Sequence, residues 1–498
     1  MNVNPITRLD YPDPDVIRVE DTYYMVSTTM HFMPGCEILQ SFDLVHWEHV
    51  TYVYETLDHT DAQQLKSGQN IYGQGMWAAS LRYHEGRFYI CFVANDTRKT
   101  YLYTSEKIDG PWKKQLIEGF YHDGSLLFDE DGRNYIVYGN DEIWITELNE
   151  DLTAPKKDGL HRLLVSDHKN PELGYEGSHI QKINGYYYIF LIHSLRDRWM
   201  RTEACFYSDS LEGEFTGGDV LCDDRGYCGQ GVAQGGIVDT PDGKWYAMLF
   251  QDSGAVGRIP ILLPVTWKDH FPFFGQNGHV PEEIEVHSTR PGYIYQPLVG
   301  SDDFCNGLLP RWQFNHDPDP RYYHLDALQG TYTITTREVC TELTQAVNTL
   351  TQRMSYPSCA AEVTVDASAL KEGDVAGLCA LQSCYAAVGI TKHHGKYEVL
   401  MLDKKEDGIL DMTEGTVVES HQMNFRLEAD FCNMKDEARC YYRVNKGDWL
   451  PIGTVHKLYF KLDHFTGCRF GLFCYAAEET GGSACFRDFK YYDVDEIS

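Results

Sequence analysis

A repeated β-hairpin is the feature that most constrains how this chain can fold. Five segments share an apolar strand, a turn containing an acidic residue or glycine, and a second strand rich in aromatic residues. The copies are DVIRVEDTYYMVSTT from Asp15, SLRYHEGRFYICFVA from Ser80, SLLFDEDGRNYIVYG from Ser125, SHIQKINGYYYIFLI from Ser178 and GIVDTPDGKWYAMLF from Gly236. Since no long segment has sustained helical periodicity, the repeat indicates an all-β fold.

The spacing of the copies predicts a five-bladed β-propeller. Successive turns lie 46 to 64 residues apart, which leaves room for about four short strands in each repeat. Repeats of this size are typical of propeller blades. A β-sandwich with five coincidentally similar hairpins is the alternative, but the turn and aromatic positions agree in all five copies. We therefore expect a propeller over residues 1–290.

Aligning the copies on their turns singles out the eighth residue before each turn. That residue is Asp13, Trp77, Asp123, Glu176 and Gln234 in the five copies. Equivalent positions on the innermost strands of a propeller converge around its central axis. We therefore expect three carboxylates, a tryptophan and a glutamine to gather at one mouth of the central channel.

Bringing three carboxylates together costs free energy, because like charges repel. Such a cluster therefore indicates either a catalytic function or a bound cation that neutralises the charge. Hard oxygen ligands suit calcium, so a structural Ca²⁺ in the channel is one interpretation, although no motif indicates it. Glycoside hydrolysis is the other, because it needs one carboxylic acid and one carboxylate. Trp77 favours hydrolysis, since a sugar ring presents an apolar face that stacks on an aromatic ring.

Charge and composition restrict the partners. A formal net charge of −31 over 498 residues argues against nucleic acid and anionic membranes, whereas a neutral sugar is compatible with it. The opening MNVNPITRLDYPDP lacks the pattern of a signal peptide, and the apolar run at 259–265 is too short to span a bilayer. Fifteen cysteines without CxxC pairs indicate reduced thiols rather than a zinc site. We therefore expect a cytoplasmic protein.

The chain resembles glycoside hydrolase family 43, particularly its two-domain β-xylosidases and α-L-arabinofuranosidases. The resemblance covers essentially the whole chain, and its motifs are Asn4-Pro5-Ile6, Pro12-Asp13-Pro14, Gly75-Met76-Trp77-Ala78, Asp123-Gly124-Ser125, Glu176-Gly177-Ser178-His179, Gly257-Arg258 and Leu263-Pro264-Val265-Thr266-Trp267. It implies hydrolysis with inversion, in which Asp13 is the general base and Glu176 the general acid. Asp123 would orient Glu176, and we expect its charge to raise the pKa of Glu176.

The resemblance also suggests residues that contact the sugar. Arg258 matches an arginine that reaches the bound sugar beside the catalytic carboxylates, and Trp77 would stack on the sugar ring. Where relatives often have a histidine linked to calcium, this chain has Gln234, which we expect to bind water beneath the sugar. His31 and Phe32 belong to a segment that departs from the family's aromatic pattern, so we expect them to line the sugar site. This chemistry needs no metal or cofactor.

The hairpin repeat stops at about Ser301. Alternating strands such as 361–365 and 458–462 predict an antiparallel β-sandwich over residues 303–498. This part resembles the concanavalin-like C-terminal domain of family 43 β-xylosidases. The connector, HSTRPGYIYQPLVGSD, is short and contains no Ser/Thr/Pro-rich spacer, which favours a domain packed on the propeller over a tethered binding module.

We therefore expect an inverting, exo-acting glycosidase that releases terminal β-D-xylose or α-L-arabinofuranose from oligosaccharides of xylan and other plant hemicelluloses. An endo-acting arabinanase on the same propeller and a non-catalytic sugar-binding propeller are the alternatives. A retaining β-fructosidase is disfavoured, because its Asn-Asp-Pro-Asn-type opening is absent. Relatives suggest that subunits associate as a homo-oligomer. Neither nucleic acid nor a membrane is an expected partner.

Overall fold

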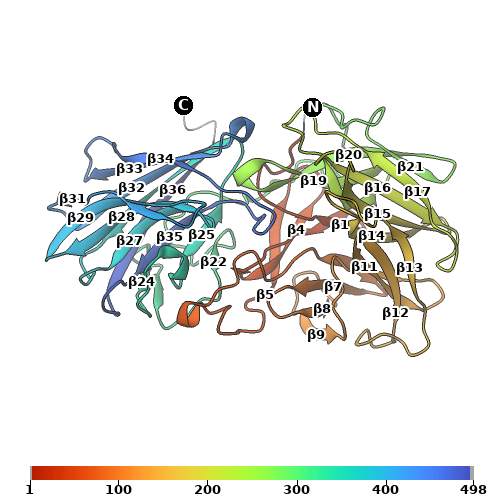
Figure 1. Cartoon of the computed structure of the whole chain (residues 1–498), viewed down its shortest axis with the longest axis horizontal. Coiled ribbons are helices and arrows are strands. Elements are labelled where there is room, and N and C mark those ends of the chain that lie inside the picture. The colour runs from red at the N-terminus through yellow and green to blue at the C-terminus, as the bar shows by residue number, and fades with distance from the viewer. Residues whose placement is uncertain (1–2, 494–498) are drawn as a thin grey trace.

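The computed structural model describes residues 3–493, whose strands form a propeller and a sandwich lying side by side (Figure 1). The predicted fold class, a five-bladed β-propeller followed by an antiparallel β-sandwich, is confirmed. The last propeller strand ends at Phe274 and the first sandwich strand after it begins at Gln313. The outermost residues of the two predicted domains, 1–2 and 494–498, lie outside the described residues.

Each blade is a four-stranded antiparallel sheet with its strands in chain order. The first two blades contain β1 (Asp15–Val19), β2 (Thr22–Val26), β4 (Gly35–Ser41), β5 (Glu48–Tyr54), β6 (Ser80–His84), β7 (Arg87–Ala94), β8 (Lys99–Ser105) and β9 (Lys113–Ile117). The third and fourth contain β10 (Ser125–Phe128), β11 (Asn134–Asn140), β12 (Glu142–Leu148), β13 (His161–Ser166), β14 (Glu176–Ile183), β15 (Tyr186–Ser194), β16 (Arg201–Ser208) and β17 (Thr216–Leu221). The fifth contains β18 (Ala233–Asp239), β19 (Trp245–Asp252), β20 (Arg258–Lys268) and β21 (Phe271–Phe274).

The innermost strands of the five blades form a closed ring. In order around the axis, β1, β6, β10, β14 and β18 each contact the next, and β18 contacts β1 again. The N-terminal segment helps to close the ring, because the Asn4 side chain exchanges hydrogen bonds of 2.7 and 2.8 Å with the backbone of Leu262 in the last blade. Since all five strands start at the same end of the channel, the aligned positions of the repeat meet there.

Two sheets form the sandwich. In spatial order, the larger contains β3 (Phe32–Met33), β22 (Gln313–Asn315), β25 (Leu350–Arg353), β35 (Arg469–Tyr475), β27 (Val375–Leu381), β28 (Tyr385–His393), β29 (Lys396–Lys404) and β30 (Leu410–Met412), with β31 (Thr416–Val418) also paired to β29. The smaller contains β23 (Tyr323–Asp326), β24 (Thr331–Thr335), β36 (Ser483–Asp493), β26 (Ser358–Asp366), β32 (Gln422–Asp430), β33 (Glu437–Val444) and β34 (Leu450–Lys457).

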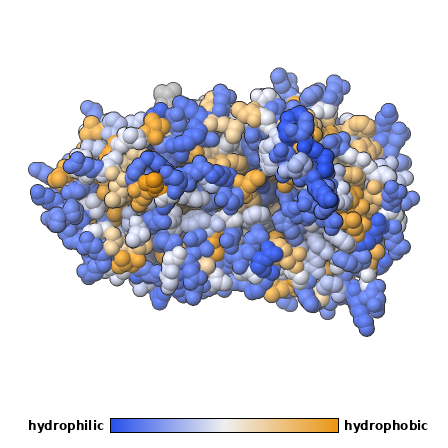
Figure 2. Space-filling model, in the orientation of Figure 1, coloured by the Kyte–Doolittle hydropathy of each residue, from blue (hydrophilic) through white to orange (hydrophobic). Residues whose placement is uncertain are grey.

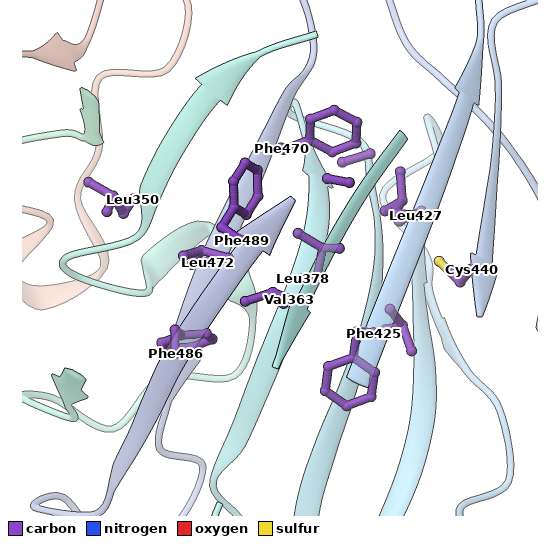
Figure 3. Packing of buried hydrophobic residues seen from close by; sticks show 14 of the residues in the cluster. Leu350, Val363, Leu378, Phe425, Leu427, Cys440, Phe470, Leu472, Phe486 and Phe489 are labelled. Atoms are coloured by element: carbon purple, nitrogen blue, oxygen red, sulfur yellow. The ribbon is translucent and has the colours of Figure 1, made fainter. Parts of the chain in front are cut away.

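Alternation of apolar and polar residues along these strands builds one core between the two sheets. Figure 3 shows Leu378, Phe470 and Leu472 of the larger sheet directed toward Val363 and Phe425 of the smaller one. Each of these side chains is at most 1% exposed. Burial of one such side chain contributes roughly 1.5–3 kcal/mol. The propeller shares this core, because Ala255, Val256 and Ile259 of the fifth blade belong to the same buried cluster.

Helical structure among the described residues is limited to four 3₁₀ helices: η1 (Lys66–Gly68), η2 (Gly254–Val256), η3 (Leu343–Gln345) and η4 (Cys432–Met434). Accordingly, none of the helices in residues 3–493 has the length and apolar character that crossing a membrane requires. The face drawn in Figure 2 is largely hydrophilic, with apolar residues scattered over it. All fifteen cysteines are unpaired.

A strand from the first blade joins the sandwich to the propeller. The short strand β3 pairs with β22, so that Met33 lies opposite Phe314 and Phe32 opposite Asn315. Near it, the buried ion pair between Glu37 and Arg353 crosses the boundary with an N–O distance of 2.8 Å. Backbone pairing and a buried charge pair together fix how the sandwich sits on the propeller.

We expect Glu37→Gln to lower the free energy of unfolding by about 3–5 kcal/mol at pH 7, because it leaves the buried charge of Arg353 without its partner. Burial alone would raise the pKa of Glu37, but Arg353 and a hydrogen bond from His49 lower it to about 2. The stabilisation is therefore complete above the ordinary glutamate pKa of 4.5 and is lost as the pH falls toward about 2. Chemical denaturation at several pH values measures both effects.

The matched control is Glu106→Gln, because Glu106 pairs with Arg87 at 3.6 Å on the surface and is mostly exposed. We expect no measurable change in unfolding for this variant. Equal behaviour of the two variants would contradict a stabilising role for the buried pair.

Candidate active site

A pocket of about 200 Å³ lies at the end of the channel where the innermost strands begin. All five residues of the aligned position line it, namely Asp13, Trp77, Asp123, Glu176 and Gln234. The other lining residues are His122, Leu173, Trp199, Arg201, Arg258, Leu462 and Phe465. The repeat therefore brings together residues that lie up to 221 positions apart in the sequence.

The backbone at the aligned position is left-handed in several blades. Asp13, Asp123 and Gln234 have φ values of 54°, 47° and 60°. At Glu176 the next residue, Gly177, takes this conformation with φ 64°, and a Cβ atom there would lie 2.7 Å from the Gln234 side chain. Strain of this kind costs about 1–3 kcal/mol per residue and is concentrated at functional sites. The local turns direct the side chains into the pocket rather than along the strands.

Asp13 is held firmly by its neighbours and is only 2% exposed. Its Oδ1 atom accepts a hydrogen bond from Arg258 Nη1 at 2.7 Å, and its Oδ2 atom accepts one from the hydroxyl of Thr28. Arg258 is fixed in turn by Asp252, whose Oδ1 lies 3.2 Å from Arg258 Nε. The carboxylate of Asp13 thus faces the pocket in one defined orientation.

Glu176 and Asp123 lie on either side of an imidazole. His122 Nε2 is 3.4 Å from Glu176 Oε2 and 3.5 Å from Asp123 Oδ2. The Asn140 amide donates a hydrogen bond to Glu176 Oε2 at 2.8 Å, and the N–H of Gly177 donates to Asp123 Oδ2 at 2.9 Å. The third blade therefore orients Glu176, which belongs to the fourth.

The imidazole of His122 shifts the pKa of Glu176 in the direction opposite to the one predicted. Burial raises that pKa, but the hydrogen bond and the charge of His122 outweigh burial. The arginines at 201 and 258 act in the same direction, so the pKa of Glu176 is lowered. The predicted rise in the pKa of Glu176 is therefore wrong: the two carboxylates repel each other, but the cation between them, which the repeat did not reveal, outweighs this repulsion. Burial, opposed mainly by His122, leaves the pKa of Asp123 raised to about 6.

The sandwich supplies one wall of the pocket. The ring of Phe465 lies 3.7 Å from the guanidinium carbon of Arg258 and makes an edge contact with Trp77 at a centroid distance of 5.1 Å. Leu462 lines the pocket beside it. Both residues lie between strands β34 and β35 of the C-terminal domain, so the pocket is complete only with both domains in place.

Comparison with known proteins identifies the family. The glycosyl hydrolases family 43 profile matches residues 3–272, and the beta xylosidase C-terminal concanavalin A-like domain profile matches residues 301–492. The chain belongs to glycosyl hydrolase family 43.

Family 43 relatives align along most of this chain. A beta-xylosidase of Formosa agariphila is 26% identical over 99% of this chain and 89% of its own length. A xylosidase/arabinosidase 43B of Humicola insolens is 25% identical over 98% of this chain and 96% of its own length. The solved structure of a bifunctional GH43-CE protein of Bacteroides eggerthii is 42% identical with a TM-score of 0.91 and covers 98% of this chain. This chain spans 63% of that longer protein.

His31 and Phe32 do not line the pocket of this family 43 chain, in contrast to the expectation that they contact sugar. Both are buried where the domains meet, because strand β3 pairs with the sandwich. The His31 ring lies against those of His316 and His464, with centroids 4.8 and 5.3 Å away. Burial lowers the pKa of His31 well below its ordinary value, so the residue is a neutral part of the interface.

Six of the residues that line the pocket were not found from the sequence, namely His122, Leu173, Trp199, Arg201, Leu462 and Phe465. His122 directly precedes Asp123 and could have been found by asking which polar residues flank the aligned position. Arg201 lies at the start of β16, where its Nη1 atom is 3.0 Å from Asp252 Oδ2. Trp199 precedes it, and Phe465 comes from the other domain. The repeat contains no signal for these last three, because it aligns only the innermost hairpin of each blade.

Among the described residues, one cluster consists of His122, Asp123 and Glu176. An imidazole nitrogen of His122 and one carboxylate oxygen from each acid all lie within 4.8 Å of one another. Hydrogen bonds from Asn140 and Gly177 already occupy the two carboxylates, and the imidazole lies between them. We interpret this trio as groups that share a proton.

A larger hollow of about 410 Å³ lies at the opposite ends of the same innermost strands. Its lysine and arginine side chains are already paired: Arg18 with Asp239 at 2.5 Å, Arg82 with Asp15 at 2.8 Å and Lys182 with Asp129 at 2.7 Å. Most of the other residues that line this hollow are apolar or aromatic side chains of the innermost strands. The smaller pocket, where the three carboxylates converge, is therefore the candidate active site.

Proposed function

We propose that this chain is an inverting, exo-acting glycosidase that releases terminal β-D-xylose or α-L-arabinofuranose from hemicellulose-derived oligosaccharides. The observation that carries the proposal is that Asp13 and Glu176, from the first and fourth blades, line one small pocket. The names of the Formosa and Humicola relatives, a beta-xylosidase and a xylosidase/arabinosidase, favour a pentose.

In the proposed reaction, Asp13 accepts a proton from a water molecule while the water oxygen bonds to the anomeric carbon. The glycosidic bond breaks on the opposite face of the sugar, and Glu176 gives its proton to the departing oxygen. Inversion requires a gap of roughly 6.5–9.5 Å between the two carboxyl groups to admit the water. Residues on two non-adjacent blades, facing each other across a channel, suit such a gap.

Asp123 is a positioning residue in this proposal. Its carboxylate accepts the N–H of Gly177, the residue that follows Glu176. It thereby holds the left-handed turn that directs Glu176 into the pocket. Arg258 has a double role, because it orients Asp13 from one side and presents its guanidinium group to the pocket from the other.

The size of the pocket supports removal of single terminal sugars. Its volume of about 200 Å³ is below the roughly 300–1,000 Å³ of pockets that hold drug-sized ligands, and one monosaccharide is smaller than those. Phe465 and Leu462 close one side. An endo-acting enzyme needs a groove that is open at both ends, which this wall would obstruct.

Hydrolysis of three substrates tests the proposal. We expect release of 4-nitrophenol from the β-D-xylopyranoside, the α-L-arabinofuranoside or both, and the faster substrate defines the activity. Linear arabinan should lose monosaccharides from its ends without a rapid fall in viscosity. A rapid fall in viscosity would identify an endo-acting arabinanase, and binding of sugar without hydrolysis of any substrate would identify a sugar-binding propeller.

We expect Phe465→Leu to raise KM for the aryl pentoside about tenfold and to change kcat by less than about threefold. The variant keeps an apolar side chain but removes the aromatic face beside Trp77, and with it part of the uniform binding of the sugar. Steady-state kinetics at one pH measure the effect. The control is Phe431→Leu, the same change in the sandwich core, which should leave KM unchanged; a similar rise in both variants would contradict the assignment.

We further propose that the enzyme needs no metal or organic cofactor and works in a reducing compartment such as the cytoplasm. The unpaired state of the fifteen cysteines supports a reducing compartment, because an oxidising environment favours disulfides.

A further inference from the structure

His122 lies between the two carboxylates on which the proposed acid step depends. Its Nε2 atom faces both, 3.4 Å from Glu176 Oε2 and 3.5 Å from Asp123 Oδ2. The side chain is 21% exposed, and its ring makes an edge contact with Trp77 at a centroid distance of 6.2 Å. An imidazole in this position can exchange a proton with the acid without any movement of the backbone.

The surroundings make this imidazole a cation near neutral pH. The charged groups around His122 and Glu176 are Asp13, Asp123, Glu176, Arg201 and Arg258. Burial lowers the pKa of His122, but the carboxylates, Asp123 foremost, raise it to about 9. Glu176 has its pKa lowered by the same contact. The trio therefore holds one proton on the imidazole, and none on the carboxyl group that must donate it.

We propose that His122 holds the proton that Glu176 delivers to the leaving group and passes it from His122 Nε2 to Glu176 Oε2. This inference rests on the proposed function. His122 is then the proton source of the general acid, a role that neither the repeat nor the family motif assigns to it.

The proton balance is complete without a further reactant. The Nε2–H bond of the imidazolium breaks and an O–H bond forms on Glu176, so that an ion pair becomes a neutral pair. Glu176 then gives this proton to the glycosidic oxygen as its bond to the anomeric carbon breaks, and Asp13 takes one proton from the attacking water. After the sugar leaves, the proton on Asp13 passes to solvent and His122 takes one from solvent. One water is consumed in each turnover.

Binding of sugar favours the transfer for a physical reason. A sugar ring in the pocket displaces water, and an ion pair loses more hydration energy than a neutral pair. The other hydrogen-bond donor to Glu176 is the amide of Asn140, which orients the carboxyl group but has no acidic proton. Among the residues that line the pocket beside Glu176, the imidazole is the group able to supply one at neutral pH.

The wild-type enzyme gives the first test. If His122 holds the catalytic proton, kcat/KM for an aryl pentoside should fall on the alkaline side with an apparent pKa of about 9. Added EDTA should not change the profile. An alkaline limb at pH 7 or below would overturn the inference, as would loss of activity with EDTA that a divalent cation restores.

His122→Gln gives the second test, because glutamine keeps a hydrogen-bond donor but cannot store a proton. We expect the alkaline limb to move down by at least about one pH unit. At pH 8 a substrate with a poor leaving group should lose about 10²-fold in kcat, whereas a 2,4-dinitrophenyl pentoside, which needs little protonation, should lose less than about threefold. His122→Asn provides a second variant if the first folds poorly.

Two controls separate this inference from its alternatives. His161→Gln changes a histidine stacked on Trp144, outside the pocket, and should leave the pH profile unchanged. A merely structural role for His122 predicts equal losses with both leaving groups and an unmoved alkaline limb, which would overturn the inference. If Glu176→Gln shows no dependence on the leaving group, the acid assignment fails first. If Glu176→Gln shows that dependence and His122→Gln does not, only the inference about His122 fails.

Discussion

Asp13→Asn lowers kcat by about 10³-fold or more, because an amide cannot accept a proton from the attacking water. The change preserves the volume of the side chain. Arg258 keeps its second partner, Asp252, at 3.2 Å, so the guanidinium group is not left without a counter-charge. The loss should be similar for aryl pentosides with good and poor leaving groups, since both need an activated water. Steady-state kinetics with both substrates measure the effect.

Asp15→Asn is the matched control for this variant. Asp15 lies two residues after Asp13, at the start of β1, is fully buried, and pairs with Arg82 at 2.8 Å. Its side chain does not line the pocket. We expect this control to unfold at lower denaturant concentration but to keep kcat within about threefold. A comparable loss of kcat in both variants would show that the Asp13 effect comes from a broken buried pair rather than from a missing base.

Glu176→Gln is expected to lower kcat by about 10³–10⁴-fold for a xylo- or arabino-oligosaccharide, because the alkoxide leaving group departs only with a proton. For a 2,4-dinitrophenyl pentoside the loss should be below about tenfold, since that leaving group is stable as an anion. A plot of log kcat against the pKa of the leaving phenol measures the contrast. Its slope should be steep for the variant and shallow for the wild type.

The two variants therefore give opposite patterns, and the pair tests the assignment of roles more strictly than either alone. Asp13→Asn should be insensitive to the leaving group, whereas Glu176→Gln should depend on it strongly. The reversed pattern would exchange the roles of base and acid. Equal sensitivity in both variants would contradict a division of labour between the two carboxylates.

The propeller and the five aligned pocket residues were predictable because a repeat converts sequence position into spatial position. Each hairpin occupies the same place in its blade, so Asp13, Trp77, Asp123, Glu176 and Gln234 meet once the ring closes. The fold follows from the alternation of apolar residues and from the turn positions, both of which are local. No knowledge of distant contacts was needed to obtain either result.

The remaining pocket residues depend on contacts that the repeat does not describe. Phe465 reaches the pocket from a loop of the sandwich, and its position depends on how two domains pack. His31 and Phe32 lie close in sequence to the first blade, but pairing with β22 removes them from the pocket. The pKa of Glu176 depends on the distance to His122, and the sequence alone gives no distances.

The configuration of the released sugar shows whether Asp13 acts as a base or as a nucleophile. Proton NMR of the anomeric signal, recorded during the first minutes of hydrolysis of the preferred aryl pentoside, identifies the first product before it mutarotates. A single displacement by water that Asp13 activates yields a sugar with inverted anomeric configuration, which is the product we expect. A product that keeps the configuration of the substrate would contradict this expectation, and would make Asp13 a nucleophile that forms a covalent intermediate.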